Sequence, residues 1–304
     1  MNIDTVKYFL GNPGRIVAAL GSKGLLNWMP DKMYLEIVAS AALGYKVDLD
    51  NPRTFNEKLN WLKIYDRKPI YTRMADKYGV RDYIAETIGE EYLIPLVGGP
   101  WDSFEEIDFD ALPEEFVLKT THDSGGVVIC RDKAKFDIEA ARKKLTWHLK
   151  REYFWGKREW PYKDVKPRII AEKYMEDESG FLNDYKFWCF NGRAELCNVC
   201  TERFSAGGVK LTYLDRNWVK QNFERESPAS DKEIERPDKL DLMLSLADKL
   251  SQGHAFLRVD FYEIMGRLYF GELTFYPGGS FTKFKPAEWD EILGSWIELP
   301  EKTK

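Results

Sequence analysis

Two neighbouring segments near the C-terminus carry the residues whose types and spacing best suit chemistry. Arg258 and Asp260 lie two positions apart in a run of aromatic and β-branched residues, and Glu272 and Thr274 have the same spacing in the next run. Such runs predict strands, in which alternate side chains share a face. Gly266 lies in the short connection, so we expect a hairpin. A connection with an odd number of residues would place all four side chains on one face.

Two carboxylates on one face of a hairpin need a cation between them. Asp260 and Glu272 would have Cβ atoms roughly 5–8 Å apart, and carboxylates at that spacing repel each other unless a cation separates them. A site with one or two carboxylates suits Mg²⁺, which keeps water and takes oxygen ligands from a substrate phosphate. Arg258 suits a phosphate as well. The hairpin therefore predicts either magnesium-dependent phosphate chemistry or a surface with two solvated acids.

The composition limits the class of protein. The chain has 304 residues, 44% of them hydrophobic, which is enough for a substantial core in two or three lobes. Its net charge of −5 argues against a nucleic-acid partner, because such proteins usually carry a basic face. Four cysteines are too few for a disulfide scaffold and indicate a reducing compartment. Cys197 and Cys200 have the C-x-x-C spacing of zinc and redox sites, but without a second pair we expect them to pack in a strand.

We expect a cytoplasmic protein whose first 70 residues form a helical region. No targeting segment is visible, and no apolar run reaches the ~20 residues of a membrane span. Thr54 and Glu57 form a capping box at the start of one helix. The apolar stretch from 8 to 45 either packs on the rest of the chain or rests on the inner face of a membrane.

The rest of the chain predicts alternating strands and helices. We expect strands at 116–121, 127–130, 168–175, 185–190, 194–199, 256–261 and 269–279, and helices at 75–88, 137–153 and 237–250. Because no long βαβ ladder occurs, we predict an α+β fold rather than a doubly wound sheet.

Two further segments could bind a nucleotide. Lys119 stands near the end of an apolar strand and is followed by His122-Asp-Ser-Gly-Gly126. A lysine is rarely buried without a partner, and a phosphate held by the backbone N–H groups of 124–127 could be that partner. An ordinary hairpin is the alternative, since no Walker sequence is present. The extended segment Glu172-Lys-Tyr-Met175 could pair with a purine edge, or it could be a strand that ends in charges.

The order of these segments resembles the ATP-grasp superfamily. A strand lysine with a glycine loop comes first, then Glu172-Lys-Tyr-Met175, then a strand with Asp184 and Lys186, and finally Arg-x-Asp with Glu-x-Thr. Within that superfamily the chain is most similar to the TupA-like group, known from teichuronopeptide and other bacterial surface-polysaccharide gene clusters. The resemblance covers residues 50 to 298 and rests on these motifs taken together: Phe55-Asn-Glu-Lys-Leu-Asn-Trp61, Tyr65-Asp66, Ala75-Asp-Lys77, Thr121-His-Asp-Ser-Gly125, Pro167-Arg-Ile-Ile-Ala-Glu172 and Gly271-Glu-Leu-Thr-Phe-Tyr-Pro277.

The resemblance implies a role for particular residues. Two α+β lobes would hold ATP, and Mg²⁺ would be bound by Asp260 and Glu272. The third ligand in the family is usually Asn and is here Thr274, a poorer ligand, which leaves a second metal position open. Lys186 and Arg258 would be catalytic and face the transferred phosphate. The expected ATP-binding residues are Lys119, His122, Ser124, Gly125, Gly126, Glu172, Lys173, Tyr174, Met175 and Asp184.

By the same resemblance, the chain is expected to be an ADP-forming carboxylate–amine ligase that works through an acyl phosphate. It would join an amine such as an amino acid to a sugar acid of a surface polysaccharide or its precursor, so its partners are a nucleotide and a small-molecule or saccharide acceptor. Arg203 and Lys210 are candidates to bind a substrate carboxylate. We divide the chain into a helical region (1–70), a connector with a first lobe (71–172) and a second lobe with the metal site (173–304).

Three alternatives stay open at this point. Asp48-Leu-Asp50 and Asp108-Phe-Asp110 both fit the D-x-D pattern with which glycosyltransferases bind a metal and a sugar nucleotide. A kinase on the same fold would differ only in the final acceptor. A non-enzymatic interaction protein could retain the scaffold, although the strand lysine and the two carboxylates argue against it.

Overall fold

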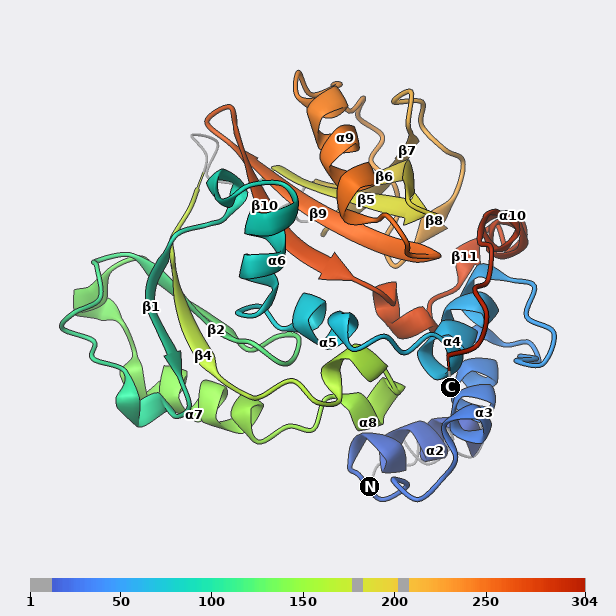
Figure 1. Cartoon of the computed structure of the whole chain (residues 1–304), viewed down its shortest axis with the longest axis horizontal. Helices are drawn as coiled ribbons and strands as arrows, with labels where there is room; N and C mark the ends of the chain where they lie inside the picture. Colours follow the sequence, from blue (N-terminus) through green and yellow to red (C-terminus); the bar gives the residue numbers. More distant parts are fainter. Residues whose placement is uncertain (1–12, 177–182, 202–207, 304) are drawn as a thin grey trace.

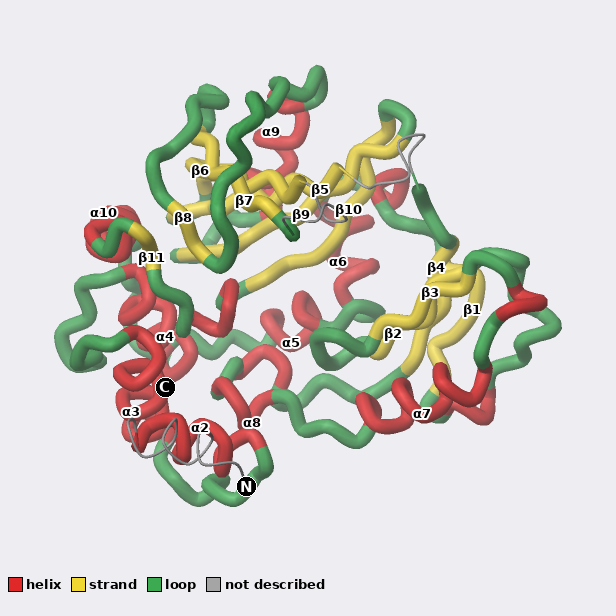
Figure 2. The backbone as a smooth tube through the Cα atoms, turned by 180° about the vertical axis from the view of Figure 1, so that it is seen from behind, coloured by secondary structure: helices red, strands yellow, loops and turns green. Residues whose placement is uncertain are grey.

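The computed structural model describes residues 13–176, 183–201 and 208–303. Two antiparallel sheets form separate halves of the molecule, and α5 (Ile70–Ala75) and α6 (Val80–Thr87) lie between them (Figures 1 and 2). Helices and antiparallel sheets together confirm the α+β expectation. Among the described residues, no helix has the length and apolar character needed to cross a membrane.

The first sheet has four strands in the order β1-β4-β2-β3: β1 (Leu96–Trp101), β4 (Ile169–Lys173), β2 (Phe116–Thr120) and β3 (Val127–Cys130). One face is covered by α7 (Ile138–Leu149), whose Ala141 and Leu145 join the same buried cluster as the apolar side chains of β2 and β4. The Asp137 carboxylate caps α7 by accepting from the N–H of Ala140, as the sequence predicts. After α7 come the short helix α8 (Phe154–Lys157) and the 3₁₀ turn η4 (Trp160–Tyr162).

The second sheet has five strands in the order β10-β9-β5-β6-β7: β10 (Arg267–Thr274), β9 (Phe256–Ile264), β5 (Asn183–Phe190), β6 (Arg193–Thr201) and β7 (Lys210–Asp215). The amphipathic helix α9 (Leu240–Leu250) contributes Met243, Ala247 and Leu250 to the largest core, where they join Leu257 and Val259 of β9. A small pair of strands, β8 (Glu224–Arg225) and β11 (Phe284–Lys285), lies beside this sheet, and η5 (Pro277–Ser280) follows β10.

A helical layer contains α2 (Pro13–Ser22), α3 (Asp31–Leu43), α4 (Phe55–Tyr65) and the late helix α10 (Glu288–Trp296). The capping box of α4 is confirmed, because Thr54 and Glu57 bond reciprocally. The C-terminal segment returns to this layer, where the Asp290 carboxylate accepts from the backbone and side chain of Asn56. The 3₁₀ turns η1 (Glu90–Tyr92), η2 (Phe104–Glu106) and η3 (Lys133–Lys135) complete the regular structure.

The single helix expected over 75–88 is wrong at its start. The chain breaks between α5 and α6, because the Asp76 carboxylate accepts from the N–H of Tyr78 and pairs with Arg168 at 2.7 Å. This local side-chain bond competes with the helical ladder. The break matters for the site, since it directs Lys77 towards the first sheet, where its N–H bonds to the Thr121 carbonyl.

The hairpin of β9 and β10 places its polar residues by a bulge rather than by its loop. The connection has two residues, Met265 and Gly266, both with positive φ (48° and 69°), so it is not the odd-numbered connection that would itself place all four side chains on one face. With an even loop alone, Thr274 would face away from Arg258. A register shift between Phe270 and Leu273 adds one residue to β10, and Thr274 therefore pairs with Arg258.

Candidate active site

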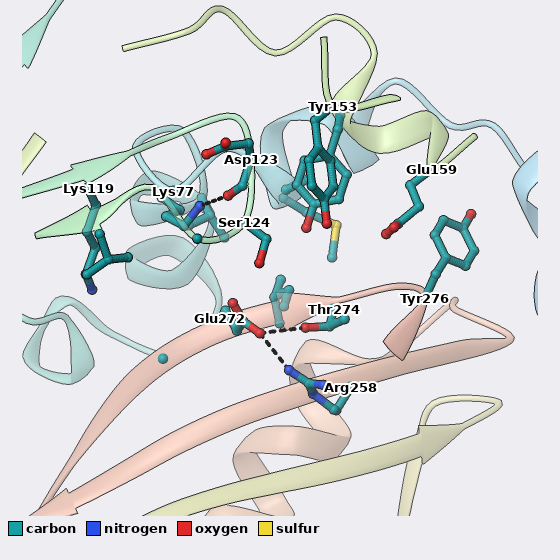
Figure 3. A pocket seen from close by; sticks show the side chains of 18 of the residues that line it. Lys77, Lys119, Asp123, Ser124, Tyr153, Glu159, Arg258, Glu272, Thr274 and Tyr276 are labelled. Atoms are coloured by element: carbon teal, nitrogen blue, oxygen red, sulfur yellow. Dashed lines mark hydrogen bonds and ion pairs between the residues drawn. The ribbon is translucent and has the colours of Figure 1, made fainter. Parts of the chain in front are cut away.

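A cavity of about 390 Å³ is lined by residues of both sheets and of the helices between them (Figure 3). Its wall combines the β2–β3 turn, the α5–α6 connection, the end of β4, the α8–η4 segment, β10 and η5. The polar and aromatic members of the wall are Lys77, Arg81, Lys119, Asp123, Ser124, Tyr153, Lys157, Glu159, Tyr162, Glu172, Arg258, Phe270, Glu272, Thr274 and Tyr276. Residues that are far apart in the sequence thus meet at one polar cavity.

The turn after β2 is fixed by the buried carboxylate of Asp123. This carboxylate pairs with the Thr120 hydroxyl and the His148 ring, and the guanidinium of Arg151 lies 3.5 Å from it. Because Thr120 ends β2 and His148 lies in the last turn of α7, the turn is tied to two elements of the first lobe. The backbone next to Ser124 is therefore held in place before any ligand binds.

The structure divides the residues expected in this loop. Ser124 and Gly125 line the cavity, whereas His122 and Gly126 do not. The ring of His122 is buried and its Nε2 lies 3.1 Å from the carbonyl of His148, while burial lowers the pKa of the ring. At Gly126 an added Cβ would lie 1.7 Å from the hydroxyl of the last residue of β2. These two positions therefore stabilise the conformation of the turn without lining the cavity.

Lys119 and Glu172 both line the cavity and bond to each other. The Lys119 ammonium donates to the Glu172 carboxylate on the adjacent strand, and the Arg81 guanidinium lies 3.6 Å from the same carboxylate. Their side chains are 24% and 11% exposed, so the pair faces the cavity rather than the core. Lys119, expected to contact a phosphate, and Glu172, expected to bind the purine, are thus each other's ion-pair partners in this structure.

The rest of the expected adenine segment lies beside the cavity. The N–H of Lys173, expected to read a purine, donates to the carbonyl of Pro95 at 2.9 Å. Lys173 and Met175 line an adjoining cavity. Tyr174 bonds to Glu176 at 2.8 Å and lies next to the Arg131 guanidinium.

Lys77 lines the cavity, although sequence analysis predicted no role for it. Its ammonium donates to the backbone carbonyl of Asp123. Burial lowers the pKa of Lys77, while Glu272 and Asp123 oppose the shift. The motif Ala75-Asp-Lys77 was the available signal, since an acid that breaks a helix next to a lysine indicates a constrained polar position.

On the second sheet, four charged residues form a buried network. Asp260 is fully buried and accepts from the Arg258 guanidinium at 2.7 Å through both oxygens, and from the Lys186 ammonium at 2.8 Å. Lys186 also pairs with Asp184 at 2.7 Å. Burial alone would raise the pKa of Asp260, but the two cations lower it. Burial would lower the pKa of Arg258 and of Lys186, yet the carboxylates raise both.

Only Arg258 of this network lines the cavity; Asp184, Lys186 and Asp260 lie beneath it. Asp184, expected to bind ATP, is thus a counter-ion of Lys186, and neither residue lines the cavity. The cation between Asp260 and Glu272 is Arg258, whose guanidinium also lies 2.6 Å from the Glu272 carboxylate.

The carboxylate of Glu272 is the donor that best fits a metal. Its side chain is 49% exposed and directed into the cavity, and the Thr274 hydroxyl donates to it at 3.0 Å (Figure 3). One carboxylate, completed by water and phosphate oxygens, is a sufficient protein contribution for Mg²⁺. Asp260 does not fit the same role here, because both of its oxygens already accept from cations.

The remaining expected site residues lie elsewhere. Lys210 begins β7 and lies outside the cavity wall, and Arg203 lies outside the described residues. The first acids of the two D-x-D patterns accept from backbone N–H groups of the turns that follow, Asp48 from residues 50 and 51 and Asp108 from residues 110 and 111. Neither lines the cavity, and turn formation accounts for both patterns.

Comparison with known proteins identifies the family. A family model described as TupA-like ATPgrasp matches residues 57–298. The chain belongs to the TupA-like ATP-grasp family. This confirms the expected superfamily and group. A search of curated proteins found no match.

Solved structures of several ligases are similar to the chain. A D-alanine–D-alanine ligase from Bacillus anthracis complexed with ATP is 18% identical, with 66% of this chain and 54% of that chain covered and a TM-score of 0.38. The Helicobacter pylori D-alanine–D-alanine ligase is 13% identical, with 80% and 69% covered and a TM-score of 0.40. The ATP-grasp ligase PsnB is 12% identical, with 90% and 65% covered and a TM-score of 0.40. The match thus spans about half the length of the Bacillus anthracis chain.

Proposed function

We propose that the chain is an ATP- and Mg²⁺-dependent ligase that joins a carboxylate to an amine through an acyl phosphate and releases ADP. The observation that carries this proposal is the convergence of Lys77, Lys119 and Arg258 with the carboxylate Glu272 at one cavity of an ATP-grasp protein. A dense negative charge such as a triphosphate needs several cations in a fixed arrangement.

ATP binding would exchange the pair between Lys119 and Glu172 for two ligand contacts. The Lys119 ammonium would turn to the phosphates, and Glu172 would accept from the adenine amino group. The backbone N–H groups next to Ser124 and Gly125 are fixed by the Asp123 anchor and would contact the phosphates from the other side. Lys77, whose side chain is constrained by its bond to the same turn, adds positive charge there.

Arg258 would act on the transferred phosphate. Its guanidinium is held at the cavity wall by two hydrogen bonds to Asp260, so it is already oriented to stabilise charge in the cavity. A carboxylate oxygen of the donor attacks the γ-phosphorus, and the bond to ADP breaks. The amine nitrogen then attacks the acyl carbon, inorganic phosphate leaves, and the amine loses a proton. When bound by Glu272, Mg²⁺ would neutralise and orient the phosphate oxygens.

For the donor we propose a sugar acid of a bacterial surface polysaccharide or its precursor, and for the location the reducing cytoplasm. The choice of donor is supported by membership of the TupA-like group, known from surface-polysaccharide gene clusters. The location is supported by four free cysteines. Products discriminate between the alternatives. The protein should be incubated with ATP, Mg²⁺, single amino acids and uronic-acid oligosaccharides, and ADP, AMP and amide should be measured. ADP with amide supports the ligase, ADP with a stably phosphorylated saccharide and no amide indicates a kinase, and AMP contradicts the acyl-phosphate route.

Glu272→Gln tests the metal carboxylate. We expect kcat to fall by about 100-fold or more, because charge alignment at the phosphate is lost. The Kd for ATP without metal, measured by calorimetry, should change by less than about threefold, since the side chain keeps its size. Glu115→Gln, at an exposed position, is the matched control. An equal loss of metal-free ATP binding would show that Glu272 supports the fold instead.

A further inference from the structure

The end of the cavity formed by α8 and η4 has a wall that the proposed phosphate chemistry does not use. Lys157 and Glu159 both line it, and Arg158 between them does not. Arg158 follows α8 with a left-handed backbone (φ 52°), which turns the chain so that the two flanking side chains reach the same cavity. A non-glycine residue in this conformation is strained and needs support from its surroundings.

That support comes from the helical layer at the N-terminus. Arg158 is fully buried, its Nε lies 3.2 Å from the Asp31 carboxylate, and it donates to the Leu26 carbonyl at 2.8 Å. Its guanidinium lies over the ring of Tyr34, 4.5 Å from the ring centre. Residues 26–34 therefore hold the wall of the cavity in place.

Glu159 offers the cavity a buried carboxyl group that pairs with no side chain of the described residues. The residue is 5% exposed, and within the described residues its carboxylate has no hydrogen-bond or ion-pair partner. Figure 3 shows the carboxylate directed into the cavity. Burial raises the pKa of Glu159, while Lys63 and Lys157 oppose the shift. The ammonium of Lys63 is already used by Asn60 and by the carbonyl of Gly279.

Lys157 offers a positive charge beside it. Its aliphatic chain lies across Gly279, where an added Cβ would be 2.3 Å from the Lys157 Cδ. Its ammonium lies 3.5 Å from the Gly278 carbonyl, too far for a strong hydrogen bond. A buried carboxylate without a partner is unfavourable unless a ligand supplies N–H donors or a positive charge. The Lys157 ammonium, in turn, can donate hydrogen bonds to an anionic group of a ligand.

We propose that this end of the cavity binds the amine substrate as a free α-amino acid. The amino group of the ligand would donate to the Glu159 carboxylate, and the Lys157 ammonium would donate to the carboxylate of the ligand. The inference rests on the proposed ligase function and specifies the amine. A simple amine or an amino sugar would use Glu159 and leave Lys157 without a partner. The rings of Tyr153 and Tyr162, which also line this end, would face the side chain of the amino acid.

The test measures binding of the 20 common L-α-amino acids by calorimetry, with ADP and Mg²⁺ present. We expect at least one to bind. Its analogue without the amino group and its analogue without the carboxyl group should each bind at least tenfold more weakly. Binding of no amino acid while ADP binds would overturn the inference and leave the proposed function standing. If ADP itself does not bind, the proposed function fails and the inference fails with it.

Two variants assign the charges. Glu159→Gln should weaken binding of the amino acid about tenfold or more and remove the preference over the analogue without the amino group. Lys157→Met should remove the preference over the analogue without the carboxyl group. Glu152→Gln and Lys150→Met, at exposed positions nearby, are the matched controls. ADP affinity shows that each variant is folded, and amino-acid binding equal to that of the controls would refute the assignment.

Discussion

The two sheets place their charges in different ways around one cavity. On the first sheet, Lys119 and Glu172 form a pair whose side chains are 24% and 11% exposed, and both face the cavity. On the second sheet, the Asp260 side chain is 1% exposed and pairs with both Arg258 and Lys186, so its charge is compensated within the protein. The first pair can exchange partners when a ligand arrives, whereas the second network is a fixed platform that presents one guanidinium to the cavity.

The energies of such arrangements support this difference. A partly exposed ion pair contributes at most about 1 kcal/mol, so a ligand can replace it easily. Breaking a buried pair by removing one partner costs about 3–5 kcal/mol, because the other charge stays buried and uncompensated. The comparison therefore predicts large stability effects on the second sheet and large binding effects with small stability effects on the first.

The largest effect is expected for Asp260→Ala. The change leaves Arg258 without its two hydrogen bonds and Lys186 with one carboxylate fewer, so we expect the free energy of unfolding to fall by about 3–5 kcal/mol. Urea unfolding followed by circular dichroism measures it. Asp164→Ala, at an exposed position, is the control. A loss below about 1 kcal/mol would show that the network is solvated, and the contrast between the sheets would disappear.

His254 tests whether the packing beside the second sheet is dry. The ring is buried near Tyr71 and Phe275, and burial lowers its pKa from 6.5 to about 4. Between these values the unfolded chain binds more protons, so stability rises with pH from about 4 to 6.5 and is lost as the pH falls. The difference of 2.5 units at 1.36 kcal/mol each corresponds to about 3 kcal/mol.

The measurement is urea unfolding at several pH values from 4 to 7 for the native chain and for His254→Gln. We expect the variant to lose much of the pH dependence over this interval. Identical slopes for the two proteins would show that the ring is hydrated and titrates normally, which would contradict a dry core beside the second sheet.

The sequence predicted the local part of this structure. The capping box of Thr54, the helix expected from residue 137 and the strands expected at 185–190 and 194–199 depend on residues close in the chain, and all are present. The order of motifs was enough to recognise the family. Of the expected nucleotide residues, Lys119, Ser124, Gly125 and Glu172 line the cavity.

The remainder depends on contacts between distant segments. The bulge next to Gly271 brings the backbone close to Asp260, because a Cβ added at Gly271 would lie 3.1 Å from the Asp260 carbonyl. The alternation of residues in the sequence does not predict this bulge. The cation between the two acids proved to be a side chain of the same hairpin. The wall with Glu159 depends on Arg158, whose conformation is held by Asp31 more than a hundred residues earlier.

Lys119→Met should have the smallest effect on stability and a clear effect on binding. Without Lys119 the Glu172 carboxylate keeps the Arg81 guanidinium 3.6 Å away, so the free energy of unfolding should change by no more than about 1 kcal/mol. The Kd for ATP should rise at least about tenfold, because a phosphate contact is lost. Urea unfolding and calorimetry measure the two effects, with the exposed Lys143→Met as the control.

The pair of results separates two kinds of lysine. If Lys119→Met destabilises the protein as strongly as Asp260→Ala, the first sheet is also a fixed platform, and Glu172 cannot be released to a ligand. If ATP affinity is unchanged while stability is intact, the pair with Glu172 persists in the native complex and the phosphates are held without Lys119. Only weak ATP binding on an intact fold agrees with a pair that opens for the nucleotide.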